Sequence, residues 1–194
     1  MKTNIILAGV GGQGILTIAA ILDIAALASG LNIKQSEVHG MSQRGGAVQS
    51  HVRISDKEIF SDLIPQGKAD IIISVEPMEL LRYLPFLKKN GHLVTDSNPF
   101  LNILNYPKLE ELYTEIKSFP NALLIDAKAI AKELGNSKAT NIVLLGAIAH
   151  LLPLSDESLK EAINTLFSKK GAKIVSKNIE AFNKGKKIAT EKAL

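Results

Sequence analysis

Residues 4–14 read Asn-Ile-Ile-Leu-Ala-Gly-Val-Gly-Gly-Gln-Gly, and the long apolar segment Ile15 to Leu31 follows directly. An apolar run that breaks at closely spaced glycines and resumes as a longer run predicts a strand, a tight turn and a helix. Gly9, Gly11 and Gly14 fit the spacing G-x-G-x-x-G of a phosphate-binding turn. Glycines let a phosphate approach the backbone, and the following helix directs its free N–H groups at the turn. We therefore predict contact with a phosphate-bearing ligand, with a purely structural turn as the alternative.

A second glycine-punctuated stretch, residues 36–46, reads Ser-Glu-Val-His-Gly-Met-Ser-Gln-Arg-Gly-Gly. It occupies the place where a dinucleotide-binding fold has its second strand and a ribose-binding acid, and Glu37 lies about 20 residues beyond the glycines, as such an acid does. Arg44 is not required at a dinucleotide site. Its guanidinium is suited to clamping a carboxylate or phosphate with two hydrogen bonds. An arginine that anchors a subunit interface is an equal alternative.

The composition is that of a globular protein of one domain, with 194 residues, 46% of them hydrophobic and 22% charged. The first apolar run is short and meets a glycine turn, so we expect no signal peptide. Asp23 interrupts the longest apolar segment, which favours a buried helix over a membrane span. We expect a cytoplasmic protein that binds neither nucleic acid nor membrane.

Metal chemistry is not expected on this chain. It has no cysteine, and its histidines at 39, 51, 92 and 150 lack the spacing of metal ligands. The net charge of +4 is concentrated at Lys169–Lys170 and Lys184–Lys187. We interpret these lysines as solvated helix ends, although a basic surface also helps to hold an anionic cofactor or an acidic partner.

Strand and helix patterns alternate along the rest of the chain. Strands are predicted at 33–38, 47–54, 69–75, 92–96 and 122–126, and helices at 12–29, 77–87, 108–116, 127–134, 142–152, 156–168 and 172–187. Residues 58–61 are expected to pair back on 47–54 as a hairpin, with Asn90-Gly91 ending the helix that starts at Pro77. The prediction is a single α/β domain spanning 1–194, a Rossmann-like three-layer sandwich with a mostly parallel mixed sheet and a helical C-terminal end.

Three carboxylates, Glu76, Asp96 and Asp126, each follow a predicted strand. Catalytic acids often lie at this edge of an α/β sheet, but each of these also precedes a helix or turn, where an acidic residue is a good N-terminal cap. We favour capping. No serine or cysteine nucleophile signature and no Walker lysine accompany the glycines.

The segment Gly9–Gly14 and the stretch 36–46 together resemble the gamma-type domain of the 2-oxoacid:ferredoxin oxidoreductases, with the small beta subunit of the indolepyruvate enzymes as the nearest type. The resemblance extends through residues 140–146. It implies a heteromeric enzyme that oxidatively decarboxylates a 2-oxo acid, transfers the acyl group to coenzyme A and passes electrons to ferredoxin. A partner alpha subunit would hold the thiamine diphosphate and the [4Fe–4S] clusters.

By this resemblance the present chain is a non-catalytic subunit, inactive alone, that supports coenzyme A binding and assembly. The residues expected to face the cofactor are Gly9, Gly11, Gly12, Gln13, Gly14, Ser42, Gln43 and Arg44. None of them is expected to be catalytic, and no metal-binding residue is expected.

Other functions remain open at this point. An alternative to the indolepyruvate type is the gamma subunit of a pyruvate, 2-oxoglutarate or branched-chain 2-oxoacid enzyme. A stand-alone NAD-dependent dehydrogenase would use the glycines for the pyrophosphate and Glu37 for the ribose. A nucleotide-binding regulatory module would use the same turn without chemistry.

Overall fold

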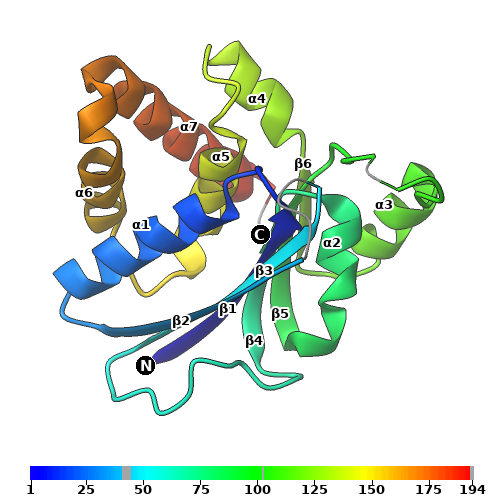
Figure 1. Cartoon of the computed structure of the whole chain (residues 1–194), viewed down its shortest axis with the longest axis horizontal. Helices are drawn as coiled ribbons and strands as arrows, with labels where there is room; N and C mark the ends of the chain where they lie inside the picture. The colour runs from blue at the N-terminus through cyan, green and yellow to red at the C-terminus, as the bar shows by residue number, and fades with distance from the viewer. Residues whose placement is uncertain (41–44, 102, 193–194) are drawn as a thin grey trace.

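The computed structural model describes residues 1–40, 45–101 and 103–192. In this part of the chain a six-stranded sheet carries helices on both faces (Figure 1). The predicted α/β class and the three layers are confirmed. No helix among these residues combines the length and the apolar character needed to cross a membrane.

The sheet is mixed. Its strands are β1 (Lys2–Val10), β2 (Asn32–His39), β3 (Ala47–Ser55), β4 (Ala69–Ser74), β5 (Leu87–Asp96) and β6 (Ala122–Ile125). Their order is β2-β3-β1-β4-β5-β6. The pairs β1–β4, β4–β5 and β5–β6 are parallel, whereas β3 is antiparallel to both β1 and β2. The carboxyl ends of four parallel strands therefore share one edge of the sheet.

The predicted hairpin between residues 58–61 and 47–54 is wrong. β3 pairs instead with β2 and β1, and the segment after it is a loop. Arg53 of β3 holds this loop, because its Nη1 donates to the carbonyl oxygens of Ser61 at 2.6 Å and Leu63 at 2.9 Å. His51 Nδ1 accepts the N–H of Ile64 at 2.9 Å. The side chains of Arg53 and His51 therefore form hydrogen bonds with backbone groups of the loop, in place of the backbone pairing of a hairpin.

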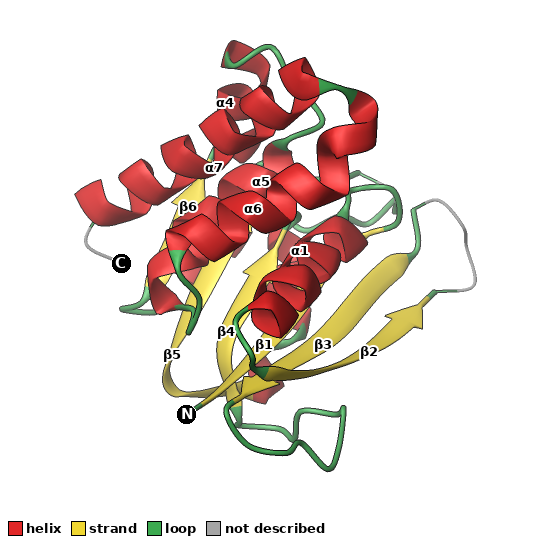
Figure 2. Cartoon of the chain, turned by 90° about the vertical axis from the view of Figure 1, so that its left-hand side faces the viewer, coloured by secondary structure: helices red, strands yellow, loops and turns green. Residues whose placement is uncertain are grey.

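The helices divide between the two faces, as Figure 2 shows for the more heavily covered one. That face carries α1 (Ile15–Ala28), α5 (Thr140–Ile148), α6 (Asp156–Phe167) and α7 (Ala172–Glu191), with α4 (Ala127–Glu133) beside them. The opposite face carries α2 (Pro77–Arg82) and α3 (Leu109–Lys117). Each face has its own buried apolar cluster.

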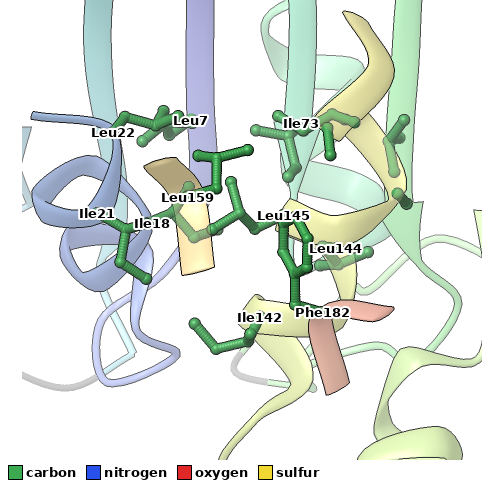
Figure 3. Close-up of a cluster of buried hydrophobic side chains, with 14 of the residues drawn as sticks. Leu7, Ile18, Ile21, Leu22, Ile73, Ile142, Leu144, Leu145, Leu159 and Phe182 are labelled. Carbon is green, nitrogen blue, oxygen red and sulfur yellow. The ribbon is translucent and has the colours of Figure 1, made fainter. Parts of the chain in front are cut away.

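The larger cluster fixes the position of α5 (Figure 3). Leu144 and Leu145 of α5 pack among side chains of the sheet, of α1 and of α7, and all three of Leu144, Leu145 and Phe182 are fully buried. Helix α5 is apolar on all sides because it lies between other helices and the sheet. This burial holds the first turn of α5 at the carboxyl edge of the sheet, where the candidate site lies.

The helix predicted over 77–87 is shorter than expected. α2 ends at Arg82, a 3-10 turn covers Leu84–Phe86, and β5 already begins at Leu87. Pro85 cannot continue an α-helix, which gives the physical reason for the early end. The Asn90-Gly91 pair lies inside β5 rather than ending a helix, with φ of 65° at Asn90.

Candidate functional site

A cavity of about 670 Å³ opens at the carboxyl ends of β1, β4 and β5. Its walls are the turn after β1, the loop after β5, the turn before α5 and the facing parts of α6 and α7. Open α/β sheets bind their ligands at this edge. The lining residues are Gly12, Gln13, Gly14, Thr17, Val75, Asp96, Asn98, Pro99, Phe100, Lys128, Asn136, Ser137, Lys138, Thr140, Asn141, Phe167, Lys170, Ile174 and Asn178.

The glycine turn forms one wall of this cavity. Gly12 and Gly14 have φ of 98° and 81°, the left-handed region in which glycine is at ease. Gln13 closes the turn: its Oε1 accepts the N–H of Val10 at 2.8 Å, and its Nε2 donates to the carbonyl oxygen of Val75 at 3.4 Å. The side chain of Gln13 thus ties the end of β1 to the end of β4, and the turn keeps one shape.

Gly9 allows close packing inside β1, unlike Gly12 and Gly14, which form the turn. It lies inside β1, and a Cβ atom there would meet Val75 Cγ2 at 2.5 Å. Gly9 and Gly11 do not line the cavity, whereas Gly12, Gln13 and Gly14 do. Ser42, Gln43 and Arg44 lie outside the described residues.

Two helices begin at the cavity without a side-chain cap. α1 starts after Gly14 and α5 after Ala139, and neither helix has an acidic residue in its first turn. The free N–H groups and the positive dipole end of both helices are therefore available to an anion.

Asn141 joins these two helix starts. Its Nδ2 donates to the carbonyl oxygen of Gly14 at 2.9 Å, across 127 positions of sequence. Asn141 is 4% exposed, and among the described residues its Oδ1 is the buried side-chain atom left without a hydrogen bond partner. Buried polar atoms are nearly always paired, so an unpaired acceptor in a cavity wall points to a missing donor.

Three lysines, Lys128, Lys138 and Lys170, come to the same cavity from α4, from the turn before α5 and from the turn before α7. The Lys170 Nζ lies 5.2 Å from the centre of the Phe167 ring, whose face attracts the cation. Together with the helix starts, these lysines give the cavity an electrostatic character that favours an anion.

The three carboxylates at the edge of the sheet cap helices, as predicted. Glu76 Oε2 accepts the N–H of Glu79 at 2.8 Å, and Asp126 Oδ1 accepts the N–H of Ala129 at 2.9 Å. Asp96 accepts the N–H of Ala127 at 2.9 Å, at the start of α4.

Asp96 is the carboxylate of these three that lines the cavity. Burial raises its pKa, while hydrogen bonds from Asn98 and from backbone N–H groups act in the opposite direction. Asn98 Nδ2 donates to both Asp96 Oδ1, at 3.1 Å, and Asp126 Oδ1, at 2.8 Å. Asp96 is therefore engaged on the protein side and fixes the loop that follows β5.

Glu37 is not placed to bind the ribose of a dinucleotide. It lies on β2, which is separated from β1 by the antiparallel β3, and it is exposed and outside the cavity lining. His39 also belongs to β2, where it pairs with Val48, and not to a loop. This topology removes the main support for a dinucleotide-dependent dehydrogenase.

Sequence reasoning missed most of the cavity wall. Asn98, Lys138 and Asn141 are far from the glycines in sequence and have no spacing that relates them to the turn. From the sequence, Lys170 is predicted only as part of a basic surface able to help hold an anionic cofactor, and the polar pair Thr140-Asn141 starts an otherwise apolar helix. No group of His, Asp and Glu among the described residues is arranged to hold a metal ion.

The fold is that of an α/β domain whose cavity presents N–H groups and lysines, and Glu76, Asp96 and Asp126 at that edge each accept an N–H at the start of a helix. The family model for pyruvate ferredoxin/flavodoxin oxidoreductase matches residues 4–188. The chain belongs to this family.

Curated relatives match over nearly the whole length. Indolepyruvate oxidoreductase subunit IorB of Pyrococcus horikoshii is 42% identical over 97% of this chain and 96% of its own. The subunit of the same name from Thermococcus kodakarensis is 40% identical with the same coverage. A 2-oxoglutarate synthase subunit KorC from Methanocaldococcus jannaschii is 31% identical over 98% of this chain and 96% of its own.

Solved structures share the fold. The keto/oxoacid ferredoxin oxidoreductase gamma subunit of Geobacter sulfurreducens aligns with a TM-score of 0.71 and 28% identity, over 97% of this chain and 99% of its own. The 2-oxoglutarate:ferredoxin oxidoreductase of Magnetococcus marinus, with 2-oxoglutarate, coenzyme A and succinyl-CoA bound, aligns with a TM-score of 0.78 and 25% identity. That alignment covers all of this chain but 31% of the other, so this chain spans about a third of that relative.

Proposed function

We propose that this chain is the small subunit of an indolepyruvate ferredoxin oxidoreductase and that its cavity binds coenzyme A. The complex oxidatively decarboxylates the 2-oxo acid to its acyl-CoA and passes electrons to ferredoxin. Residues 1–194 form a single gamma-type domain of this cytoplasmic enzyme. Indolepyruvate is supported by the names of the relatives at 38–42% identity, all of them IorB subunits.

The observation that carries the coenzyme A proposal is the pair of uncapped helix starts, joined by Asn141 and faced by three lysines. Coenzyme A carries a pyrophosphate and a 3′-phosphate, which need N–H donors and cations. Its amide and hydroxyl groups also offer donors, of the kind that the unpaired Oδ1 of Asn141 lacks. The cavity, about 670 Å³ in volume, is within the usual range for small-ligand sites.

The proposed division of labour assigns the reaction itself to a partner alpha subunit that carries thiamine diphosphate and the iron–sulfur clusters. The present chain has no cysteine for such clusters. Its own contribution is to hold the phosphate end of coenzyme A through Gly12, Gln13, Gly14 and the cavity lysines. Ser42, Gln43 and Arg44 are proposed to face the same ligand on sequence grounds alone.

A charge-reversal experiment tests the site. Coenzyme A, NAD and NADP are titrated calorimetrically into the wild-type chain and into Lys138→Glu, with Lys34→Glu as the matched control. Lys34 is an exposed residue of β2 outside the cavity. Both variants replace a lysine by a glutamate, so they change the net charge equally. Coenzyme A is expected to bind, and Lys138→Glu to weaken it at least tenfold while Lys34→Glu stays within twofold. Tight NAD binding without coenzyme A binding would overturn the proposal.

The substrate is tested on the assembled enzyme. The chain is co-purified with the thiamine-diphosphate subunit of the same organism, and ferredoxin reduction is followed with indolepyruvate, pyruvate, 2-oxoglutarate and branched-chain 2-oxo acids. We expect the highest kcat/KM with indolepyruvate and no turnover by the small subunit alone. A higher kcat/KM with another 2-oxo acid would move the chain to the gamma subunit of that enzyme.

A further inference from the structure

Asn98 is a cavity residue whose side chain is held in one orientation. It follows β5, at the start of the loop that leads to α3 (Figure 1), and it lines the cavity. Its Nδ2 donates to Asp96 Oδ1 at 3.1 Å and to Asp126 Oδ1 at 2.8 Å. An amide nitrogen carries two hydrogens, so these two bonds use both of them. The carbonyl oxygen, Oδ1, is therefore the polar atom of this side chain that is left for a ligand.

The two carboxylates that hold Asn98 are fixed in turn. Asp96 Oδ1 also accepts the N–H of Ala127 at 2.9 Å, and Asp126 Oδ1 accepts that of Ala129 at 2.9 Å. Both N–H groups belong to the first turn of α4, so this helix fixes the positions of both carboxylates. An Asn98 amide turned by 180° would place its oxygen against two carboxylate oxygens and lose both hydrogen bonds. The surroundings of the side chain therefore determine which end of the amide faces the cavity.

The oxygen of Asn98 is an acceptor without a protein donor. In the part of the chain that the structure describes, the hydrogen bonds of this side chain are the two that Nδ2 donates. The ionised phosphates of coenzyme A have no hydrogen to donate, so Oδ1 does not belong to the phosphate site. Val75, Pro99 and Phe100 contribute apolar lining to the same cavity. This part of the lining is suited to an uncharged portion of the ligand that brings a donor of its own.

We propose that Asn98 is a specificity-determining residue, whose Oδ1 accepts a hydrogen bond from an N–H group of the bound coenzyme A. This inference rests on the proposed function, and it adds how the cavity recognises the uncharged part of its ligand. Coenzyme A carries such N–H groups on the amino group of its adenine and on the amides of its pantetheine arm. A site that accepts a ligand N–H discriminates against analogues that lack it.

Asn98→Ala tests the hydrogen bond and identifies its donor. The whole chain is titrated calorimetrically with coenzyme A and with etheno-coenzyme A, whose adenine amino group has lost its hydrogens. Asn98→Ala is expected to bind coenzyme A about fivefold more weakly than wild type, the effect of one neutral hydrogen bond. If the adenine is the donor, etheno-coenzyme A binds both proteins alike. If the pantetheine arm is the donor, the substitution weakens both coenzymes by the same factor.

Asn164→Ala is the matched control. Asn164 also donates its Nδ2 to a carboxylate, that of Glu161 at 3.3 Å, but it is exposed and lies outside the cavity lining. This control is expected to bind coenzyme A within about twofold of wild type, a change smaller than that of one hydrogen bond. Inorganic pyrophosphate is a second control, because it has phosphates but no N–H group. Its binding is expected to be the same in wild type and in Asn98→Ala.

Two substitutions of Asp126 test whether the carboxylates position Asn98. Asp126→Leu removes one of the acceptors of Nδ2, so the amide of Asn98 is less firmly held. Asp126→Asn keeps an oxygen that can accept from Asn98 and from the N–H of Ala129. Asp126→Leu is expected to weaken coenzyme A by a smaller factor than Asn98→Ala, and Asp126→Asn is expected to restore the affinity. Equal affinities in both Asp126 variants would contradict this positioning role.

The results for Asn98 and for the proposed function are distinguishable. If coenzyme A binds wild type and Asn98→Ala equally well, the role of Asn98 is wrong and the proposed function stands. If Asn98→Ala weakens inorganic pyrophosphate as much as coenzyme A, the role of Asn98 is also wrong, because the substitution then acts on the shape of the cavity. If wild type does not bind coenzyme A, both proposals are overturned.

Discussion

Asn141→Leu is the substitution that most directly tests the candidate site. It removes an amide whose Nδ2 donates to the Gly14 carbonyl and whose Oδ1 is buried without a partner. Leucine has a similar size and shape and needs no hydrogen bond. The change therefore removes two groups with opposite effects on stability. The Nδ2 group stabilises the fold through its hydrogen bond, whereas the unpaired Oδ1 lowers stability as long as no ligand is bound.

The expected change in the free energy of unfolding follows from the hydrogen bonds of Asn141. Losing the bond to Gly14 costs about 1 kcal/mol, because the Gly14 carbonyl keeps the N–H of Thr17 as a donor at 3.1 Å. Removing the unpaired Oδ1 returns about 1–3 kcal/mol. The isolated chain is therefore expected to be unchanged or stabilised by up to about 2 kcal/mol, a rise in Tm of up to about 8 °C at this chain length.

The same variant is expected to lose coenzyme A affinity by at least tenfold, since the two helix starts are no longer tied together and the acceptor is gone. Stability is measured by calorimetry without ligand, and affinity by titration. Asn178→Leu is the matched control: Asn178 is 3% exposed, lines the same cavity, and its Nδ2 donates to the Ile174 carbonyl at 2.8 Å. It should lose about 1 kcal/mol. Destabilisation of Asn141→Leu by more than the control would refute the argument that Oδ1 is unpaired.

Three further substitutions test the fold. In Gly185→Ala the new Cβ would lie 1.9 Å from the Val143 carbonyl oxygen, so α5 and α7 must separate; we expect a loss on the order of 2 kcal/mol in denaturant unfolding, and wild-type stability would contradict this close approach. Burial lowers the pKa of His51, whose Nδ1 accepts the Ile64 N–H. Its contribution is therefore complete above the unfolded pKa of about 6.5 and is lost as the pH falls below that value, so His51→Gln should flatten the dependence of stability on pH between about 7.5 and 5. Ser155→Ala removes the cap of α6 and should cost about 1 kcal/mol, seen as a lower Tm.

The order of strands and helices was largely predictable, because apolar runs and helical periodicity are local properties. The predictions failed where one local signal fits two structures. Asn90-Gly91 ends a helix in one context and allows a left-handed residue inside a strand in another, and only the pairing of β5 with β4 decides between them. Residues 58–61 follow an alternating strand and a turn, which predicted a hairpin, but Arg53 Nη1 binds the carbonyl oxygens of Ser61 and Leu63 in this loop.

The candidate site was predictable only in part. The spacing of the glycines indicates a turn at Gly12, Gln13 and Gly14, since turn geometry is encoded by adjacent residues. The opposite wall depends on the hydrogen bond from Asn141 to Gly14, which joins residues 127 positions apart. No pattern within a single segment predicts this contact. The position of Asn141 beside Gly14 follows only from how α5 packs in the folded chain.

The carboxylates at the edge of the sheet fit the proposal that this cavity binds a ligand and leaves the reaction to another subunit. A general base needs a carboxylate oxygen that is free to face the substrate. Glu76 accepts hydrogen bonds at both oxygens and Asp126 caps α4, while Asp96 holds Asn98 and the first N–H of α4. These carboxylates hold the loops and helix starts around the cavity in place. The cavity itself presents backbone N–H groups and lysines. This arrangement fits the proposed division, in which this chain would hold the phosphates of coenzyme A and a partner subunit would supply the reacting carbon and its base.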